Sequence, residues 1–124
     1  MIIKMLAVGV GGFIGSILRF LISQIPMYKA FGSYPMNTFL TNIAGALIIG
    51  FVITYARQTD MSPEKLLLLK VGLCGGLTTF STFSVESLGL IENGNYLMAA
   101  AYIIFSVAIC IVGVAVGMKA AALV

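Results

Sequence analysis

The stretch Gly72-Leu73-Cys74-Gly75-Gly76-Leu77-Thr78-Thr79-Phe80-Ser81-Thr82-Phe83-Ser84-Val85-Glu86 lies in an apolar segment long enough to cross a membrane. It is a poor helix former, because each glycine in it costs about 1 kcal/mol relative to alanine and its hydroxyl side chains compete for backbone hydrogen bonds. Unpaired backbone groups at membrane depth are tolerated only where the break is buried in protein or lines a watery cavity. We therefore expect this helix to break at Gly75-Gly76 and expect the stretch to be the working part of the protein.

The composition is that of a membrane protein. The chain has 124 residues, of which 60% are hydrophobic and only 9% are charged, whereas soluble domains carry about 25% charged residues. One crossing needs about 20 apolar residues, so the chain has room for four. We predict an all-α integral membrane fold, a single transmembrane domain over residues 1–124 with four transmembrane helices per subunit. The expected spans are 4–25, 37–57, 64–88 and 96–118.

The charged residues indicate how the chain is oriented in the membrane rather than binding to a charged partner. The net charge is +3, but the lysines and arginines are scattered and lack interleaved aromatic residues, which argues against nucleic-acid binding. With four spans, both termini and the central loop share one side, and most basic residues fall there. The positive-inside rule then predicts cytoplasmic termini, in a multi-pass protein of the cell inner (plasma) membrane. Cys74 and Cys110 have no neighbouring histidine or paired cysteine, so no disulfide framework or zinc site is indicated.

A break in the third span would create two half-helices that meet near the middle of the membrane. The carbonyls that end the first half suit a cation, and the amides that begin the second half suit an anion. Thr78 or Thr79 is placed to cap the second half. No acidic residue lies at this depth, so a cation would be held by backbone oxygen, which favours a hard cation such as sodium.

The second half presents Phe80 and Phe83, accompanied by the hydroxyls of Thr79, Ser81 and Thr82. The edge of a phenyl ring carries partial positive charge, so rings turned edge-on can line an anion path without a fixed cation that would trap the ion. The alternative is that both rings only pack in the core or face lipid.

Polar residues on the second and fourth spans allow two interpretations each. The amide of Asn42 either makes an interhelical hydrogen bond or is a donor that faces a pore. Tyr102, Ser106 and Cys110 recur every four residues and share one face. They either form a track that solvates a passing ion, or their hydroxyls bond to carbonyls of their own helix.

Two charged residues lie near the ends of spans. Arg19 either extends to the membrane interface or acts inside the bundle, attracting an anion or supporting the structure. Glu86 is either an interfacial carboxylate or part of a vestibule.

These residues together closely resemble the Fluc (CrcB) family of fluoride channels. The resemblance rests on residues 72–83, on Asn42 within the sequence NTFLTNIAG at 37–45, and on GGFIGSILR at 11–19, and it covers nearly the whole chain. It implies an antiparallel, dual-topology homodimer in the lipid bilayer, with two narrow fluoride pores and a central sodium ion. It also implies passive export of fluoride from the cytoplasm, which reduces fluoride toxicity.

The resemblance also implies a role for each matching residue. The sodium ligands would be the backbone carbonyls of Gly75 and Thr78. The pore would be lined by the rings of Phe80 and Phe83, by the amide of Asn42 and by a polar track of Tyr102 and Ser106. The charges of Arg19 and Glu86 would serve a vestibule or the structure. Cys110 departs from the family, because a hydroxyl commonly continues the track at its position.

Other classes of function fit the residues less well. A small multidrug-type transporter also has four short spans, but it needs a membrane-embedded carboxylate, and the first span holds Arg19 and no acid. An enzyme would need a nucleophile with its base, or a metal cluster, at membrane depth, and the sequence offers neither. A noncatalytic assembly subunit would leave the polar residues unexplained.

Overall fold

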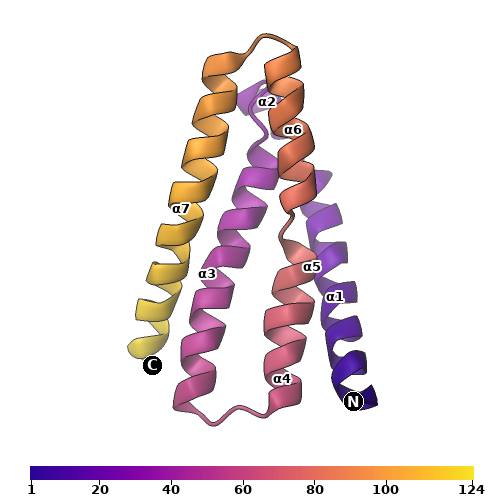
Figure 1. Ribbon diagram of the computed structural model, residues 1–124, viewed down its shortest axis with the longest axis vertical. Helices are drawn as coiled ribbons and strands as arrows, with labels where there is room; N and C mark the ends of the chain where they lie inside the picture. The colour runs from indigo at the N-terminus through magenta and orange to yellow at the C-terminus, as the bar shows by residue number, and fades with distance from the viewer.

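The computed structural model describes residues 1–124 as helices joined by short connections, with no strands (Figure 1). The third span is a composite: α4, the π-helix η1 and α5 run on without interruption, and α6 follows after a break. Four segments are long and apolar enough to cross a membrane, the third being Pro63–Glu92. This confirms the all-α prediction and the four spans. The elements are α1 (Ile2–Ser23), α2 (Tyr28–Phe31), α3 (Met36–Gln58), α4 (Pro63–Leu67), η1 (Leu68–Cys74), α5 (Gly75–Leu77), α6 (Phe80–Glu92) and α7 (Tyr96–Ala122).

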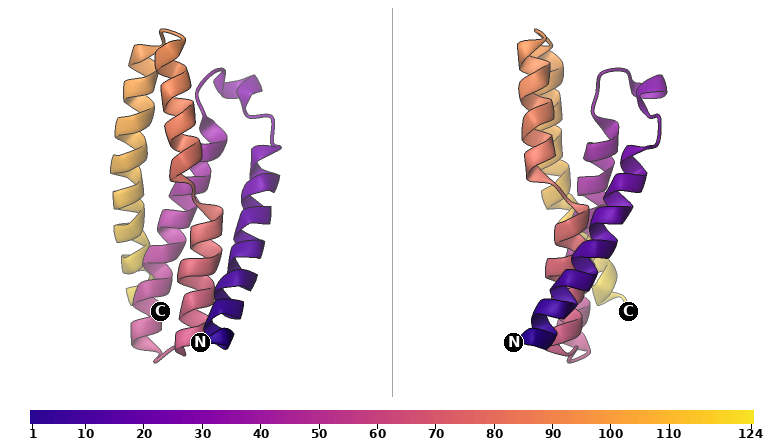
Figure 2. Two further views of the ribbon diagram at one scale, coloured as in Figure 1. Left: turned by 45° about the vertical axis from the view of Figure 1, so that its right-hand side comes forward. Right: turned by 90° about the vertical axis from the view of Figure 1, so that its right-hand side faces the viewer.

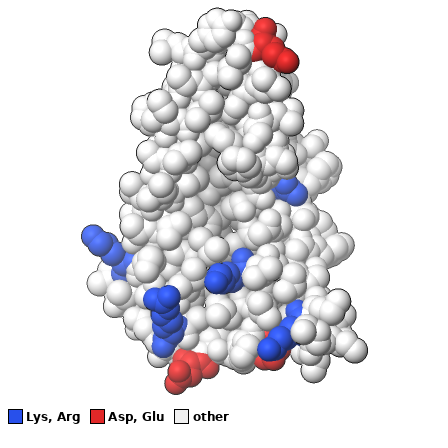
Figure 3. Space-filling view, in the orientation of Figure 1, with Lys and Arg blue, Asp and Glu red and all other residues white.

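Both chain termini and the α3–α4 connection lie at one end of the bundle, whereas α2 and the α6–α7 connection lie at the other (Figures 1 and 2). On the face shown in Figure 3, most Lys and Arg side chains gather over the half that carries the termini. The predicted orientation in the membrane rests on this distribution of basic residues. Cytoplasmic termini remain a prediction.

The helices do not pack in chain order. The helix α1 packs against η1 and α5 of the third span, and α3 packs against α7. Glycines allow the close approach of α1: a Cβ added at Gly11 would overlap the backbone oxygen of Leu68, and one added at Gly15 would overlap that of Leu73. Small residues that bring helix backbones together are typical of membrane bundles.

The third span breaks at Thr78–Thr79, so the prediction of a break at Gly75-Gly76 is wrong. Gly75 has helical angles, with φ −64° and ψ −37°, whereas Thr78 and Thr79 are extended, with ψ of 159° and 122°. Gly76 serves packing instead, since a Cβ there would lie 2.6 Å from the carbonyl oxygen of Gly12 on α1. The helix therefore tolerates the cost of its glycines because they let α1 approach.

Few side chains are buried within one chain. Only 21 of 124 residues are buried, and on α1 these are two glycines. A small cluster near the break joins α6 to α7 through Phe83, Leu90, Ala99 and Tyr102. Most large apolar side chains face outward, as expected for helices whose solvent is lipid rather than water.

Candidate functional site

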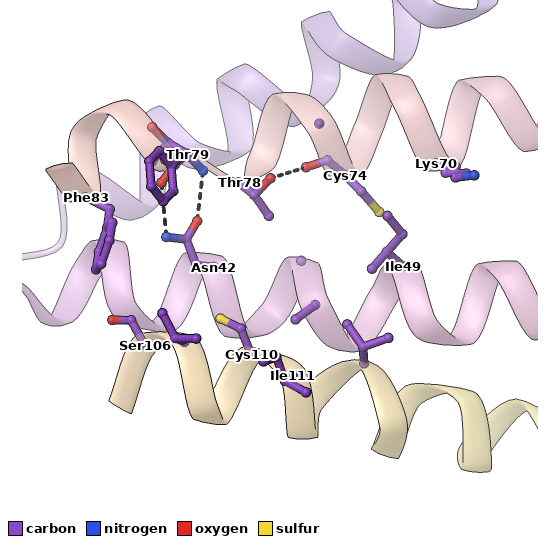
Figure 4. Close-up of a pocket in the computed structure, with 16 residues that line it drawn as sticks. Asn42, Ile49, Lys70, Cys74, Thr78, Thr79, Phe83, Ser106, Cys110 and Ile111 are labelled. Carbon is purple, nitrogen blue, oxygen red and sulfur yellow. Dashed lines mark hydrogen bonds between the residues drawn. The ribbon is translucent and has the colours of Figure 1, made fainter. Parts of the chain in front are cut away.

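The amide of Asn42, on α3, holds the break in the third span. Its Nδ2 donates to the carbonyl oxygen of Thr79 at 3.1 Å, and its Oδ1 accepts from the N–H of Thr79 at 2.8 Å (Figure 4). Thr79 is extended and has lost its helical partners, so a single side chain satisfies both of its backbone groups. The interhelical hydrogen bond considered for Asn42 is therefore present.

Each threonine at the break closes one half-helix. The Oγ1 of Thr79 accepts from the N–H of Thr82 at 3.1 Å and caps the start of α6. The Oγ1 of Thr78 donates to the carbonyl of Cys74 at 2.9 Å, at the end of the first half. The prediction that one of these threonines caps the second half is confirmed, and the capping residue is Thr79.

The backbone carbonyls of Gly75 and Thr78 lack the donors that an uninterrupted helix would give them. In such a helix, the N–H of Thr79 would bond to Gly75 and that of Thr82 to Thr78. These two N–H groups instead donate to Asn42 Oδ1 and to Thr79 Oγ1. No atom lies within 4 Å of a Cβ built on Gly75. The first half-helix thus ends in carbonyls without their helical donors, at residues that line the larger cavity.

A cavity of about 510 Å³ is lined by residues of α3, of the third span and of α7, with α3 lying between the other two (Figure 4). It brings together most of the site residues predicted from the sequence, from the second, third and fourth spans. Ser106 is buried and its hydroxyl has no hydrogen-bond partner, so the interpretation that it bonds to its own helix is wrong. The lining includes Asn42, Gly75, Thr78, Thr79, Phe80, Phe83, Ser106, Cys110 and Lys70.

A second cavity, of about 370 Å³, lies beside Arg19 at the other side of the break. Phe20 is its only hydrophobic lining residue, and the remainder are hydroxyl and amide side chains with the guanidinium of Arg19. Thr79 lines both cavities. The bonded pair of Asn42 and Thr79 therefore stands where the two cavities meet, with Thr82 on the Arg19 side.

Glu86 lies inside the bundle instead of at the interface. Its two carboxyl oxygens accept hydrogen bonds of 2.7 Å each, one from Thr38 Oγ1 on α3 and one from the hydroxyl of Tyr102 on α7. Tyr102 is completely buried and lines neither cavity, so of the three residues predicted to share this face of α7 only Ser106 and Cys110 reach the larger cavity. Thr38 lies four residues before Asn42 on the same face of α3, but nothing in the sequence indicated its bond to Glu86.

The two phenylalanines differ in environment. Phe83 is 8% exposed and its ring lies 5.1 Å from that of Tyr102, whereas Phe80 is 78% exposed. Their own ring centroids are 5.6 Å apart, and both rings reach the larger cavity. Phe83 therefore packs in the interior, whereas most of the Phe80 side chain makes no packing contact within the chain. Ser81 lies outside both cavities, with its hydroxyl 3.4 Å from that of Thr79.

A helical bundle with four spans, an interrupted third helix, a polar cavity on one side of the interruption and a largely apolar cavity with a few polar groups on the other defines a small multi-pass membrane protein. Residues 6–118 match the family model described as CrcB-like protein, Camphor Resistance (CrcB). The chain belongs to this family, as the resemblance of its motifs indicated.

Relatives of the chain carry a functional name. A protein of Methanococcus aeolicus is 46% identical over 92% of this chain and 91% of its own length. A protein of Clostridium novyi is 43% identical over 94% of this chain and 91% of its own length. A protein of Shewanella oneidensis is 40% identical over 94% of each chain. Each is named fluoride-specific ion channel FluC.

Proposed function

We propose that the protein is a fluoride-selective ion channel that lets fluoride leave the cytoplasm passively and so reduces fluoride toxicity. The observation that carries the proposal is the bonded pair of Thr79 and Asn42 where two cavities meet, neither of which is lined by a carboxylate. The relatives named as fluoride channels support the same conclusion. Hydrogen fluoride, a weak acid, crosses membranes neutral and dissociates inside, and the anion then needs a path out.

Fluoride holds its hydration shell tightly, so its path must replace water with other donors. The Nδ2 of Asn42 has two hydrogens and gives one to Thr79, which leaves the other for an anion. The unpaired hydroxyl of Ser106 is a further donor. The rings of Phe80 and Phe83 add positively polarised edges. In this proposal Thr79 and Thr82 continue the polar path, whose narrow width excludes chloride. Ser81, beside the Thr79 hydroxyl, and Tyr102, packed against Phe83, support the path from outside the two cavities.

A sodium ion at the break is a further part of the proposal. The carbonyl oxygens of Gly75 and Thr78, which lack their helical donors, suit a hard cation that prefers oxygen ligands. The absence of a side chain at Gly75 leaves room beside them. Bound sodium would supply positive charge that holds the end of the first half-helix. Preparing the protein with N-methylglucamine in place of sodium is then expected to lower both its thermal stability and its fluoride conductance, and equal values in the two cations would refute the site.

We also propose that two copies assemble as an antiparallel, dual-topology homodimer with two pores in the inner membrane. Phe80 is 78% exposed in one chain, and the open space at Gly75 lies on the same cavity. A second copy of the chain would cover this face and would enclose the ring of Phe80. A tag on the C-terminus should then be accessible from both sides of the membrane, and accessibility from one side alone would refute dual topology.

Fluoride efflux from liposomes, measured with a fluoride electrode, tests the function. Phe80→Leu removes the ring edge without removing a hydrogen bond, and Asn42→Leu removes the amide. A hydrogen bond to a charged group is worth about 1.5–3 kcal/mol, so we expect Asn42→Leu to release fluoride about tenfold more slowly or worse. Phe80→Leu should also slow efflux, because it removes the positively polarised ring edge.

Phe105→Leu is the matched control, because Phe105 is 53% exposed on α7 and lines neither cavity. Its fluoride efflux should equal that of the unchanged protein. Undiminished efflux in both Phe80→Leu and Asn42→Leu would refute the pore assignment. The absence of fluoride efflux from the unchanged protein would refute the function.

A further inference from the structure

Lys70 is the only charged residue that lines the 510 Å³ cavity, and no carboxylate lines it to neutralise the ammonium group. The residue lies on η1, inside the third span and on its exposed side. The proposed path through Asn42 and Thr79 does not use it. A lone cation facing a cavity at membrane depth therefore requires its own explanation.

The π-helical turn orients Lys70 toward the cavity. The i→i+5 hydrogen bonds of a π-helix bring residues four and five apart onto one face, which aligns Lys70 with Cys74 and Gly75. All three line the cavity. Figure 4 shows Lys70 at one end of the lining and Asn42, Thr79 and Phe83 toward the other. The nine residues from Lys70 to Thr79 correspond to about 13 Å along the axis.

Lys70 lies deep enough in the third span for its charge to need contact with water or a headgroup. Lys70 follows Pro63, the first residue of α4, by seven residues, or about 10 Å of helix. A charge at such depth is costly unless it reaches water or a headgroup. Lys70 is exposed where it borders the cavity, so its ammonium group is free to stay hydrated there. A purely interfacial role would instead have the ammonium group extend along the helix to the membrane surface.

We propose that Lys70 is the anion-collecting residue of this cavity: its ammonium group raises the local concentration of fluoride at the end of the cavity remote from Asn42. This role rests on the proposed conduction of fluoride. A cleft with one sign of charge and low-dielectric walls concentrates counter-ions and speeds their association. Because Lys70 is about 13 Å from Thr79, it attracts the ion without holding it at the narrow part of the path. Arg19 occupies the cavity beyond the break.

The test compares Lys70→Gln, Lys70→Arg and Lys70→Glu with Lys65→Gln. Lys65 lies on α4 of the same span and outside the cavity, so this control loses the same charge near the same membrane surface. Fluoride efflux is measured at fluoride concentrations well below saturation, at low ionic strength and again after adding an impermeant salt.

At low ionic strength we expect Lys70→Gln to slow efflux by about tenfold, the lower end of the range for electrostatic steering. Lys70→Arg should match the unchanged protein, and Lys70→Glu should be slowest. At an ionic strength of about 1 M the Debye length falls to about 3 Å, so Lys70→Gln should approach the unchanged protein. Lys65→Gln should be unaffected throughout.

Equal efflux from Lys70→Gln and Lys65→Gln at low ionic strength would overturn the inference and would assign Lys70 to the membrane interface. If Lys70→Gln does not elute as a folded protein, Lys70→Met takes its place, since it keeps the length of the side chain without the charge. An unchanged protein that releases no fluoride would instead refute the proposed function itself, so the two failures are distinct.

Discussion

Replacing Gly15 by alanine tests whether the glycines of α1 set its distance from the third span. A methyl group at Gly15 would overlap the carbonyl oxygen of Leu73 and would lie 2.8 Å from the amide nitrogen of Leu77. Both obstructing atoms belong to backbone, so no side chain can rotate away. To restore ordinary van der Waals distances, α1 must move outward by about 1 Å.

The expected cost follows from two opposing effects. Overpacking of this kind costs about 1–3 kcal/mol, while the change from glycine to alanine in a helix returns up to about 1 kcal/mol. The net loss in the free energy of unfolding should therefore be about 1–2 kcal/mol, a factor of roughly 5–30 in the folded-to-unfolded ratio. Fluoride efflux should also fall, because Arg19 lies one helical turn beyond Gly15 and would move with α1.

Gly9→Ala is the matched control. It is the same substitution on the same helix, but no atom lies within 4 Å of the added methyl group. This variant should be as stable as the unchanged protein or slightly more stable. Denaturant titration of both variants in detergent, followed by circular dichroism, gives the comparison. Equal stability of Gly15→Ala and Gly9→Ala would refute the argument that α1 is positioned by backbone contact.

Two further predictions concern hydrogen bonds near the break. Thr79→Val removes the acceptor for the N–H of Thr82 and should lower the free energy of unfolding by about 1 kcal/mol, whereas Thr79→Ser should not; equal losses would show that the cap is unimportant. Tyr102→Phe leaves one oxygen of Glu86 without its donor and should cost about 1–3 kcal/mol in the same titration. Adding Thr38→Val should lower stability further, because the second oxygen then also loses its donor, and an unaltered double variant would contradict this.

The sequence predicted the spans well because hydrophobic length is a strong signal. The second span, predicted as 37–57, is the helix Met36–Gln58, and the fourth, predicted as 96–118, is Tyr96–Ala122. The polar residues around the break were also identified, since hydroxyls and amides are conspicuous in apolar segments. Asn42, Thr78, Thr79 and Ser106 line one cavity, and their roles in conduction stay predictions.

The position of the break could not be predicted because glycine has two uses in a membrane helix. It weakens the helix, which suggested a break at Gly75-Gly76, and it permits close packing, which is its use at Gly76. Choosing between these requires the neighbouring helix. The partners of Asn42 were equally hidden, because they are backbone groups that become available only once Thr79 is extended.

The pairing of α1 with the third span and of α3 with α7 also determines when the bundle can assemble during synthesis. At a translation rate of about 5–20 residues per second, roughly fifty residues separate the end of α1 from its contacts on η1, a delay of about 3–10 s. The helix α3 similarly precedes α7. Each of these helices must therefore enter the bilayer before its partner exists. A ribosome stalled before α7 would leave α3 without the helix that covers it, so release of the fourth span is the step that allows the fold to close.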